Sequence, residues 1–157
     1  MTRAEFLNSF KVKFKNTIKD FVDKSQYRVY IEIDPKDIKE VVEYLFVDSE
    51  ARFIIASGMD ARFHFEILYH FNIEEIRLLI SIRVKLNRDN PRIESIASII
   101  KGAEWIEREM HELIGIDFPG NPNLERLLLP DEWPKGVYPL RTDYKEWDKD
   151  AIRDRGV

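Results

Sequence analysis

The sequence predicts an α+β fold of two layers (an α/β two-layer arrangement), with helices packed on one face of a mixed or antiparallel four-stranded sheet. Two long segments, residues 63–71 and 76–86, alternate apolar and polar side chains as strands do. Apolar residues recur at every third or fourth position in residues 3–22 and 92–114, a spacing typical of amphipathic helices.

The N-terminal half is expected to hold a helix, a strand, a second helix and a short strand, in that order. The first helix spans residues 3–22, and its apolar stripe is formed by Phe6, Phe10, Phe14, Ile18 and Phe21. Residues 27–33 alternate and predict a strand. The second helix begins at Pro35, because proline is favoured in the first turn of a helix. A short strand over residues 52–57 precedes a predicted turn at residues 58–60.

The two long strands are predicted to form a hairpin through a turn at residues 72–74. One face of this hairpin is apolar and consists of the alternate residues that begin at Phe63, whereas the other face carries histidines and charged residues. We therefore expect a sheet with one polar, uncovered face. The last helix, residues 92–114, is predicted to end at Gly115, since glycine is favoured just after a helix.

Beyond the last helix the chain becomes rich in proline. Residues 117–144 contain five prolines and no periodic pattern, yet they hold many large apolar side chains. Such a segment is too apolar for a disordered linker and is expected to lie against its own domain or a partner. We therefore divide the chain into an α/β domain, residues 1–115, and an extended C-terminal strap with a charged tail, residues 116–157.

Composition excludes several classes of protein. The chain has 157 residues, a net charge of -4 and 34% charged residues of both signs, which argues against nucleic-acid binding. It has no cysteine, so a disulfide framework, an iron–sulfur cluster and a thiolate zinc site are excluded. No apolar run approaches the roughly 18 residues of a membrane span. A single glutamine among many charged residues is typical of thermophilic proteins.

No catalytic, cofactor-binding or metal site is predicted in this chain. His111 and Glu112 begin the zinc-protease helix motif, but the position of its second histidine is Gly115. His64 and His70 lie about 20 Å apart along an extended strand, at ~3.3 Å per residue, and cannot share an ion. An independent metal-dependent enzyme and a free-standing adaptor remain as less favoured alternatives.

The last helix has a second face that its own core does not need. Trp105, Arg108 and Glu112 are expected to point outward, whereas Glu107 and Glu109 are expected at the two borders of the apolar stripe. The second face consists of Trp105, Arg108, Glu109 and Glu112. Trp and Arg are favoured anchors of protein interfaces, and a large exposed apolar surface usually marks one. Together with the apolar strap, this face predicts a partner interface.

The sequence EREMHELIGIDFPGNPNLERLLLPDEW, followed by YPLRTDY, resembles a hallmark segment of the 30 kDa subunit of NADH:quinone oxidoreductase (complex I). The positions that carry the resemblance are Glu107, Arg108, Glu109, Glu112, Leu113, Ile114, Gly115, Gly120, Pro122, Arg126, Leu128, Leu129, Pro130, Pro139, Leu140 and Arg141. Quinone-reducing members usually have histidine at the position of Asn121. This departure and the short chain make it most similar to the versions in group 4 membrane-bound [NiFe] hydrogenases and related archaeal complexes.

The resemblance implies a non-catalytic structural subunit without a cofactor, held on the cytoplasmic side of the cell membrane by its partners. Those partners are a [NiFe]-hydrogenase-like large subunit, an iron–sulfur small subunit and, indirectly, membrane subunits. Iron–sulfur clusters and a possible [NiFe] centre would belong to them. The alternative is the 30 kDa subunit of an NADH (or other donor):quinone or sulfur-reducing complex. The predicted interface residues are Trp105, Glu107, Arg108, Glu109, Glu112, Arg126, Leu128, Pro130, Trp133, Pro139, Leu140, Arg141 and Tyr144.

Overall fold

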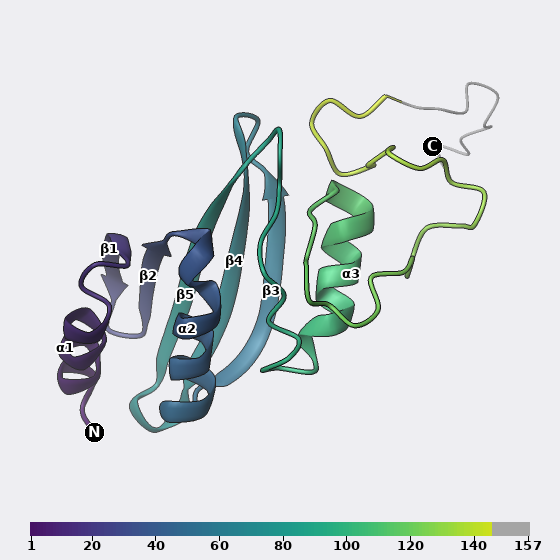
Figure 1. Ribbon diagram of the computed structural model, residues 1–157. Coiled ribbons are helices and arrows are strands. Elements are labelled where there is room, and N and C mark those ends of the chain that lie inside the picture. Colours follow the sequence, from purple (N-terminus) through teal and green to yellow (C-terminus); the bar gives the residue numbers. More distant parts are fainter. Residues whose placement is uncertain (146–157) are drawn as a thin grey trace, which may run out of the picture.

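The alternating segments form a five-stranded sheet with the strand order β1-β2-β5-β4-β3 in the computed structural model, which describes residues 1–145 (Figure 1). In chain order the elements are α1 (Arg3–Lys13), β1 (Ile18–Ser25), β2 (Arg28–Ile33), α2 (Ile38–Glu43), β3 (Arg52–Asp60), β4 (His64–Ile73), β5 (Leu78–Asn87) and α3 (Ala103–Ile114). Strands β2 and β5 are parallel and the other neighbours antiparallel. The predicted α+β class with a mixed sheet is confirmed, with five strands in place of four.

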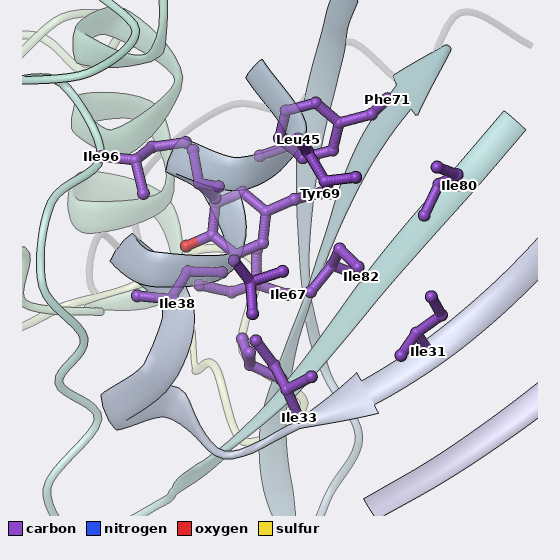
Figure 2. Packing of buried hydrophobic residues seen from close by; sticks show 14 of the residues in the cluster. Ile31, Ile33, Ile38, Leu45, Ile67, Tyr69, Phe71, Ile80, Ile82 and Ile96 are labelled. Carbon is purple, nitrogen blue, oxygen red and sulfur yellow. The ribbon is translucent and has the colours of Figure 1, made fainter. Parts of the chain in front are cut away.

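The buried core lies on one face of this sheet. Alternate residues of β4, from Phe65 to Ile73, are buried, and so are the core-facing residues of β2 and β5. Figure 2 shows Ile38 and Leu45, from α2 and the π-helical turn that follows it, packed with Tyr69 and Ile82 of the sheet. The opposite face is polar, as predicted; there Arg83 pairs with Glu66 at 3.0 Å.

Phe63 departs from the predicted apolar face. It precedes β4, in the turn after β3, and is 84% exposed. Among residues 1–145, no helix is long and apolar enough to cross a membrane.

The predicted helix over residues 3–22 is wrong in its second half. Helix α1 ends at Lys13, and Ile18 and Phe21 belong to the edge strand β1. A register shift lies between Ile18 and Asp20, so Ile18 pairs with Ile33 and Phe21 pairs with Ile31. Residues three apart therefore face the same side of the sheet, and a β-bulge imitates helical spacing.

The predicted turn at residues 58–60 is wrong, because β3 continues to Asp60. Gly58 lies inside this strand at the place where α3 packs against it. A Cβ atom added to Gly58 would lie 2.9 Å from Sδ of Met110 and 3.1 Å from Cδ1 of Ile114. The glycine thus permits a close approach of the helix and does not end the strand.

The predicted helix over residues 92–114 is wrong in its first half, because α3 begins at Ala103. The preceding segment pairs with the chain beyond α3: Ile93 N–H donates to Asp117 O at 3.1 Å, and Ser95 N–H to Pro119 O at 2.9 Å. Ile93, Ile96 and Ile100 are buried, and the carbonyl of Ile96 accepts from the amides of Ile99 and Ile100. The apolar spacing before Ala103 therefore identifies residues of the core, but the backbone there is not helical.

Candidate functional site

Helix α3 places a carboxylate inside the protein. Its core-facing positions recur at helical spacing and are Ala103, Glu107, Met110 and Ile114. Glu107 was expected at the border of this stripe, but it lies within it and is only 1% exposed. A carboxylate is buried in this way only when hydrogen-bond donors surround it.

Three donors from two other segments reach Glu107. Its Oε2 accepts from Ser95 Oγ at 2.5 Å and from Asn121 Nδ2 at 2.7 Å, while its Oε1 accepts from Ile96 N at 2.8 Å. Burial raises the pKa of Glu107, and these three hydrogen bonds partly offset that rise. Glu107 therefore joins α3 to residues 95–96 before it and to Asn121 after it.

A second carboxylate of α3 holds the backbone of the C-terminal segment, residues 116–145. Glu112 was expected to point outward to solvent, but the segment covers it and leaves it 7% exposed. It accepts from three successive amides: Leu127 N at 2.9 Å, Leu128 N at 2.5 Å and Leu129 N at 3.4 Å. Three N–H groups that donate to one carboxylate hold this part of the segment against the helix.

Two arginines bind carbonyl groups of the same segment. Arg108 donates from Nε to Glu125 O at 2.9 Å and from Nη2 to Arg126 O at 2.6 Å. Arg126 in turn donates to Pro130 O at 2.6 Å and to Trp133 O. These guanidinium groups satisfy carbonyls that have no helix or sheet partner, so the segment is ordered without regular secondary structure.

The end of α3 receives the returning chain. Gly115 ends the helix in the left-handed conformation with φ 85°, as predicted. Arg141 Nε donates to Ile114 O at 2.6 Å, and its guanidinium lies 4.2 Å from the Tyr138 ring centroid and 4.9 Å from that of Phe65. Arg141 thus binds both α3 and the sheet through a carbonyl and two aromatic faces.

The predicted interface residues gather around α3, and the structure divides them by exposure. Glu107 and Glu112 are buried, whereas Arg108, Arg126, Trp133, Pro139, Arg141 and Tyr144 are half-buried. The exposed members are Trp105, Glu109, Leu128, Pro130 and Leu140, of which Trp105 is 65%, Leu128 61% and Leu140 57% exposed. We call Trp105, Leu128 and Leu140 the outward apolar residues.

Sequence reasoning missed the internal partners of the site. Ser95 was placed in a helix, and Asn121 was noted only for its departure from the family pattern. Asp60, Arg88 and Thr142, which also hold the C-terminal segment, had no signal in the sequence. The predicted tail beyond Lys145 lies outside the described residues.

The histidines are engaged locally: His70 Nδ1 lies 2.8 Å from Ser81 Oγ, and His111 Nδ1 lies 2.8 Å from Ile116 O. In residues 1–145, no group of three or more His, Asp or Glu side chains is placed to hold a metal ion. Together, α3 and the C-terminal segment present a surface with large exposed apolar side chains.

Comparison with known proteins identifies the family. The model of the family described as respiratory-chain NADH dehydrogenase, 30 Kd subunit, matches residues 31–149. The chain belongs to this family. The family predicted from the segment that begins at Glu107 is therefore confirmed, and the match also covers most of the sheet.

Two relatives match the chain almost end to end. The chain is 33% identical over 157 residues to one subunit of the F(420)H(2) dehydrogenase of Methanosarcina mazei, and the match spans 98% of this chain and 99% of that protein. It is 32% identical over 165 residues to membrane-bound hydrogenase subunit beta of Pyrococcus furiosus. This match spans 99% of this chain and 94% of that protein.

A solved structure supports the fold. One chain of the membrane-bound sulfane sulfur reductase, an archaeal respiratory membrane complex, superposes with a TM-score of 0.80. Each chain is covered to 96%, and the sequences are 18% identical. At this identity the likeness concerns the fold alone.

Proposed function

We propose that this chain is a structural subunit, without an active site of its own, of a complex I-like membrane-bound oxidoreductase of the energy-converting [NiFe] hydrogenase type. It would sit in the peripheral arm on the cytoplasmic side of the membrane and support electron transfer coupled to ion pumping. The observation that carries the proposal is the match to membrane-bound hydrogenase subunit beta, because it spans 99% of this chain and 94% of that protein.

In this proposal the partner is the hydrogenase-like large subunit, with an iron–sulfur small subunit nearby and membrane subunits held indirectly. Cofactors, both iron–sulfur clusters and a [NiFe] centre, would belong to those chains, because this chain has no cysteine. The docking surface would be the outer side of α3 with the C-terminal segment. There Trp105 is 65% exposed, and the exposed Leu128 lies on a backbone held by Glu112 at its own amide and by Arg108 at the carbonyl of Arg126. A fixed surface loses little conformational entropy on binding.

The test is affinity purification of the tagged chain from its own cells in mild detergent, with co-purifying proteins identified by mass. Wild type should bring down a [NiFe]-hydrogenase-like large subunit and membrane proteins. The double variant Trp105→Ala, Leu128→Ala should fold but lose the large subunit, because both side chains are largely exposed and neither belongs to the hydrophobic core. Val12→Ala on α1, 78% exposed, is the matched control and should retain it. If the double variant assembles normally, the proposed docking surface is wrong.

A second candidate is the equivalent 30 kDa subunit of a dehydrogenase or sulfur-reducing complex that uses another electron donor or acceptor. The 33% identity to the F(420)H(2) dehydrogenase protein of Methanosarcina mazei, over nearly the full length of both chains, favours it. The same purification separates the candidates. Intact nickel-binding cysteines in the co-purified large subunit would support the hydrogenase, and their absence would support the second candidate.

A further inference from the structure

We propose that the chain has a binding site for a phosphate-bearing ligand at one end of the polar face of the sheet, away from α3. The site is a depression of about 740 Å³, lined by Lys24, Ser25, Tyr27, Arg28, Asn72, Glu74, Arg77 and Leu79. Volumes of roughly 300–1,000 Å³ are usual for small-ligand sites.

The sheet register gathers this site from distant parts of the chain. Ser25 pairs with Arg28 across β1 and β2, Arg28 pairs with Leu79 of β5, and Leu79 pairs with Asn72 of β4. One transverse row of the sheet therefore forms the floor. In Figure 1, β1 and β2 lie at the opposite edge of the sheet from α3 and the C-terminal segment. The site is thus independent of the proposed docking surface.

Three cationic residues line this depression although the chain has a net charge of -4. They are Lys24, Arg28 and Arg77, and none of them forms an ion pair within the part of the chain that the structure describes. The three cations outnumber the one acidic lining residue, Glu74, and like charges held together repel one another, so an anion bound among them would be stabilised.

The nearby carboxylates are already engaged outside the group of cations. Asp23 pairs with Arg3, and Glu74 pairs with Arg52 at 3.1 Å. The charge of Arg28 also acts on His70, which pairs with Ser81 two positions from the Asn72–Leu79 pair. Burial and the charge of Arg28 lower the pKa of His70. The depression is therefore electropositive despite its one acidic lining residue.

The backbone at Arg77 gives an independent indication. Arg77 lies between β4 and β5 with φ 51° and ψ 43°, the left-handed conformation that glycine or asparagine adopts most easily. The turn alone would favour one of those residues. An arginine there is explained if its side chain is needed, and its guanidinium lies 5.5 Å from the Tyr27 ring centroid, above the depression.

The donors fit phosphate chemistry. Arginine binds two phosphate oxygens at once, lysine adds a point charge, and the hydroxyl and amide of Ser25 and Asn72 can donate further hydrogen bonds. The shared chemistry is a phosphate group, whether on a small soluble molecule or on a phospholipid headgroup. Tyr27, 50% exposed beside Arg77, adds an aromatic surface for the rest of the ligand.

Calorimetric titration of the full chain with inorganic pyrophosphate at low salt tests the soluble source. We expect saturable binding at one site, weakened at least tenfold by Arg28→Gln and by Arg77→Gln. Lys39→Gln on α2, outside the depression, should leave the affinity unchanged. Circular dichroism should show that all variants remain folded, since both arginines are exposed.

Co-sedimentation with vesicles tests the lipid source. Selective binding to anionic over zwitterionic phospholipid, lost in Arg28→Gln, would assign the phosphate to a headgroup. Binding of pyrophosphate alone would assign it to a soluble ligand. The proposal is overturned if neither probe binds, if the arginine variants bind as wild type does, or if Lys39→Gln weakens binding equally.

Discussion

Asp60, at the end of β3, accepts two hydrogen bonds from Thr142, which is 82 residues later in the chain: one from its amide at 2.8 Å and one from its hydroxyl at 3.0 Å. The same carboxylate pairs with Arg88, and its side chain is only 1% exposed. Arg88 also reaches Asp143 at 3.4 Å. The sheet therefore holds the C-terminal segment at its far end, as α3 holds its middle.

Asp60→Asn should release this end of the segment. The neutral amide loses the ion pair with Arg88 and weakens the bonds from Thr142, so the free energy of unfolding should fall by about 2–4 kcal/mol. Urea unfolding measures this loss, and limited proteolysis should reveal earlier cleavage near Thr142. Asp131→Asn, an exposed site in the same segment, is the control and should change neither.

The pH dependence of this effect has a defined sign. The hydrogen bond with Arg88 holds the pKa of Asp60 well below its ordinary value. Its stabilisation is therefore present above the unfolded pKa of about 3.9 and is lost as pH falls through the lower folded pKa. The difference between wild type and Asp60→Asn should be constant near neutral pH and shrink in acid. A difference that grows in acid would contradict this assignment.

Glu107→Ala should destabilise the protein more than any exposed acid does. It leaves the amide of Ile96 and the side chain of Asn121 without their acceptor in a buried place, which should cost about 2–5 kcal/mol. Chemical unfolding at neutral pH measures it. Glu109→Ala, exposed on the same helix, should change the free energy of unfolding by less than about 0.5 kcal/mol.

A neutral substitution isolates the pH dependence of Glu107. Because its folded pKa is raised by burial, the protonated form favours the fold, and stability from this group is lost as pH rises above about 4.3 through the folded pKa. Glu107→Gln cannot titrate. Its stability should fall less than that of wild type over this pH range, and parallel profiles would refute the assignment.

The sequence predicts the two long strands of this fold because their alternating patterns are undisturbed. Strands β4 and β5 alternate over ten residues each, and one face of each packs on the core. Prediction from the sequence fails where a local feature gives one kind of element the residue pattern of another. The bulge beside Ile18 produces a helical spacing in a strand, and Gly58 serves helix packing where a turn was expected. Such cases depend on contacts between distant residues, which a local pattern does not contain.

The sequence predicts that the interface residues gather around α3, but it does not predict which of their charged side chains are buried. A glutamate in an apolar stripe is expected at the surface, because burial of an unpaired carboxylate is costly. Glu107 is buried because Ser95 and Asn121, 12 and 14 residues away, donate to it. Glu112 is covered because a segment without regular structure folds over it. Neither partner follows from periodicity.

Glu112→Ala should loosen the C-terminal segment without unfolding the domain. Three amides lose a charged acceptor, and a hydrogen bond to a charged group contributes about 1.5–3 kcal/mol. Hydrogen exchange at Leu127 and Leu128 should quicken about tenfold or more, while exchange in β4 and β5 stays near wild type. Glu125→Ala, whose side chain is exposed in the same segment, is the control. Equal quickening in the sheet would mean that the segment and domain unfold together.

Tyr69→Phe should leave the protein as stable as wild type or stabilise it by about 1 kcal/mol. The Tyr69 hydroxyl is fully buried and has no hydrogen-bond partner among residues 1–145. Burial, with the nearby charge of Glu107, raises the pKa of Tyr69, so the hydroxyl stays protonated and unpaired. Phenylalanine keeps the ring that packs among the core residues in Figure 2 and removes the unpaired group.

Urea unfolding of the Tyr69→Phe variant is the measurement. Tyr30→Phe on the polar face is the control, because it removes a hydroxyl that does have a partner: it accepts a hydrogen bond from Arg28 at 3.3 Å. A loss of more than about 1 kcal/mol in Tyr69→Phe would mean that an internal water satisfies the hydroxyl, because only a lost hydrogen bond makes removal of a buried hydroxyl unfavourable.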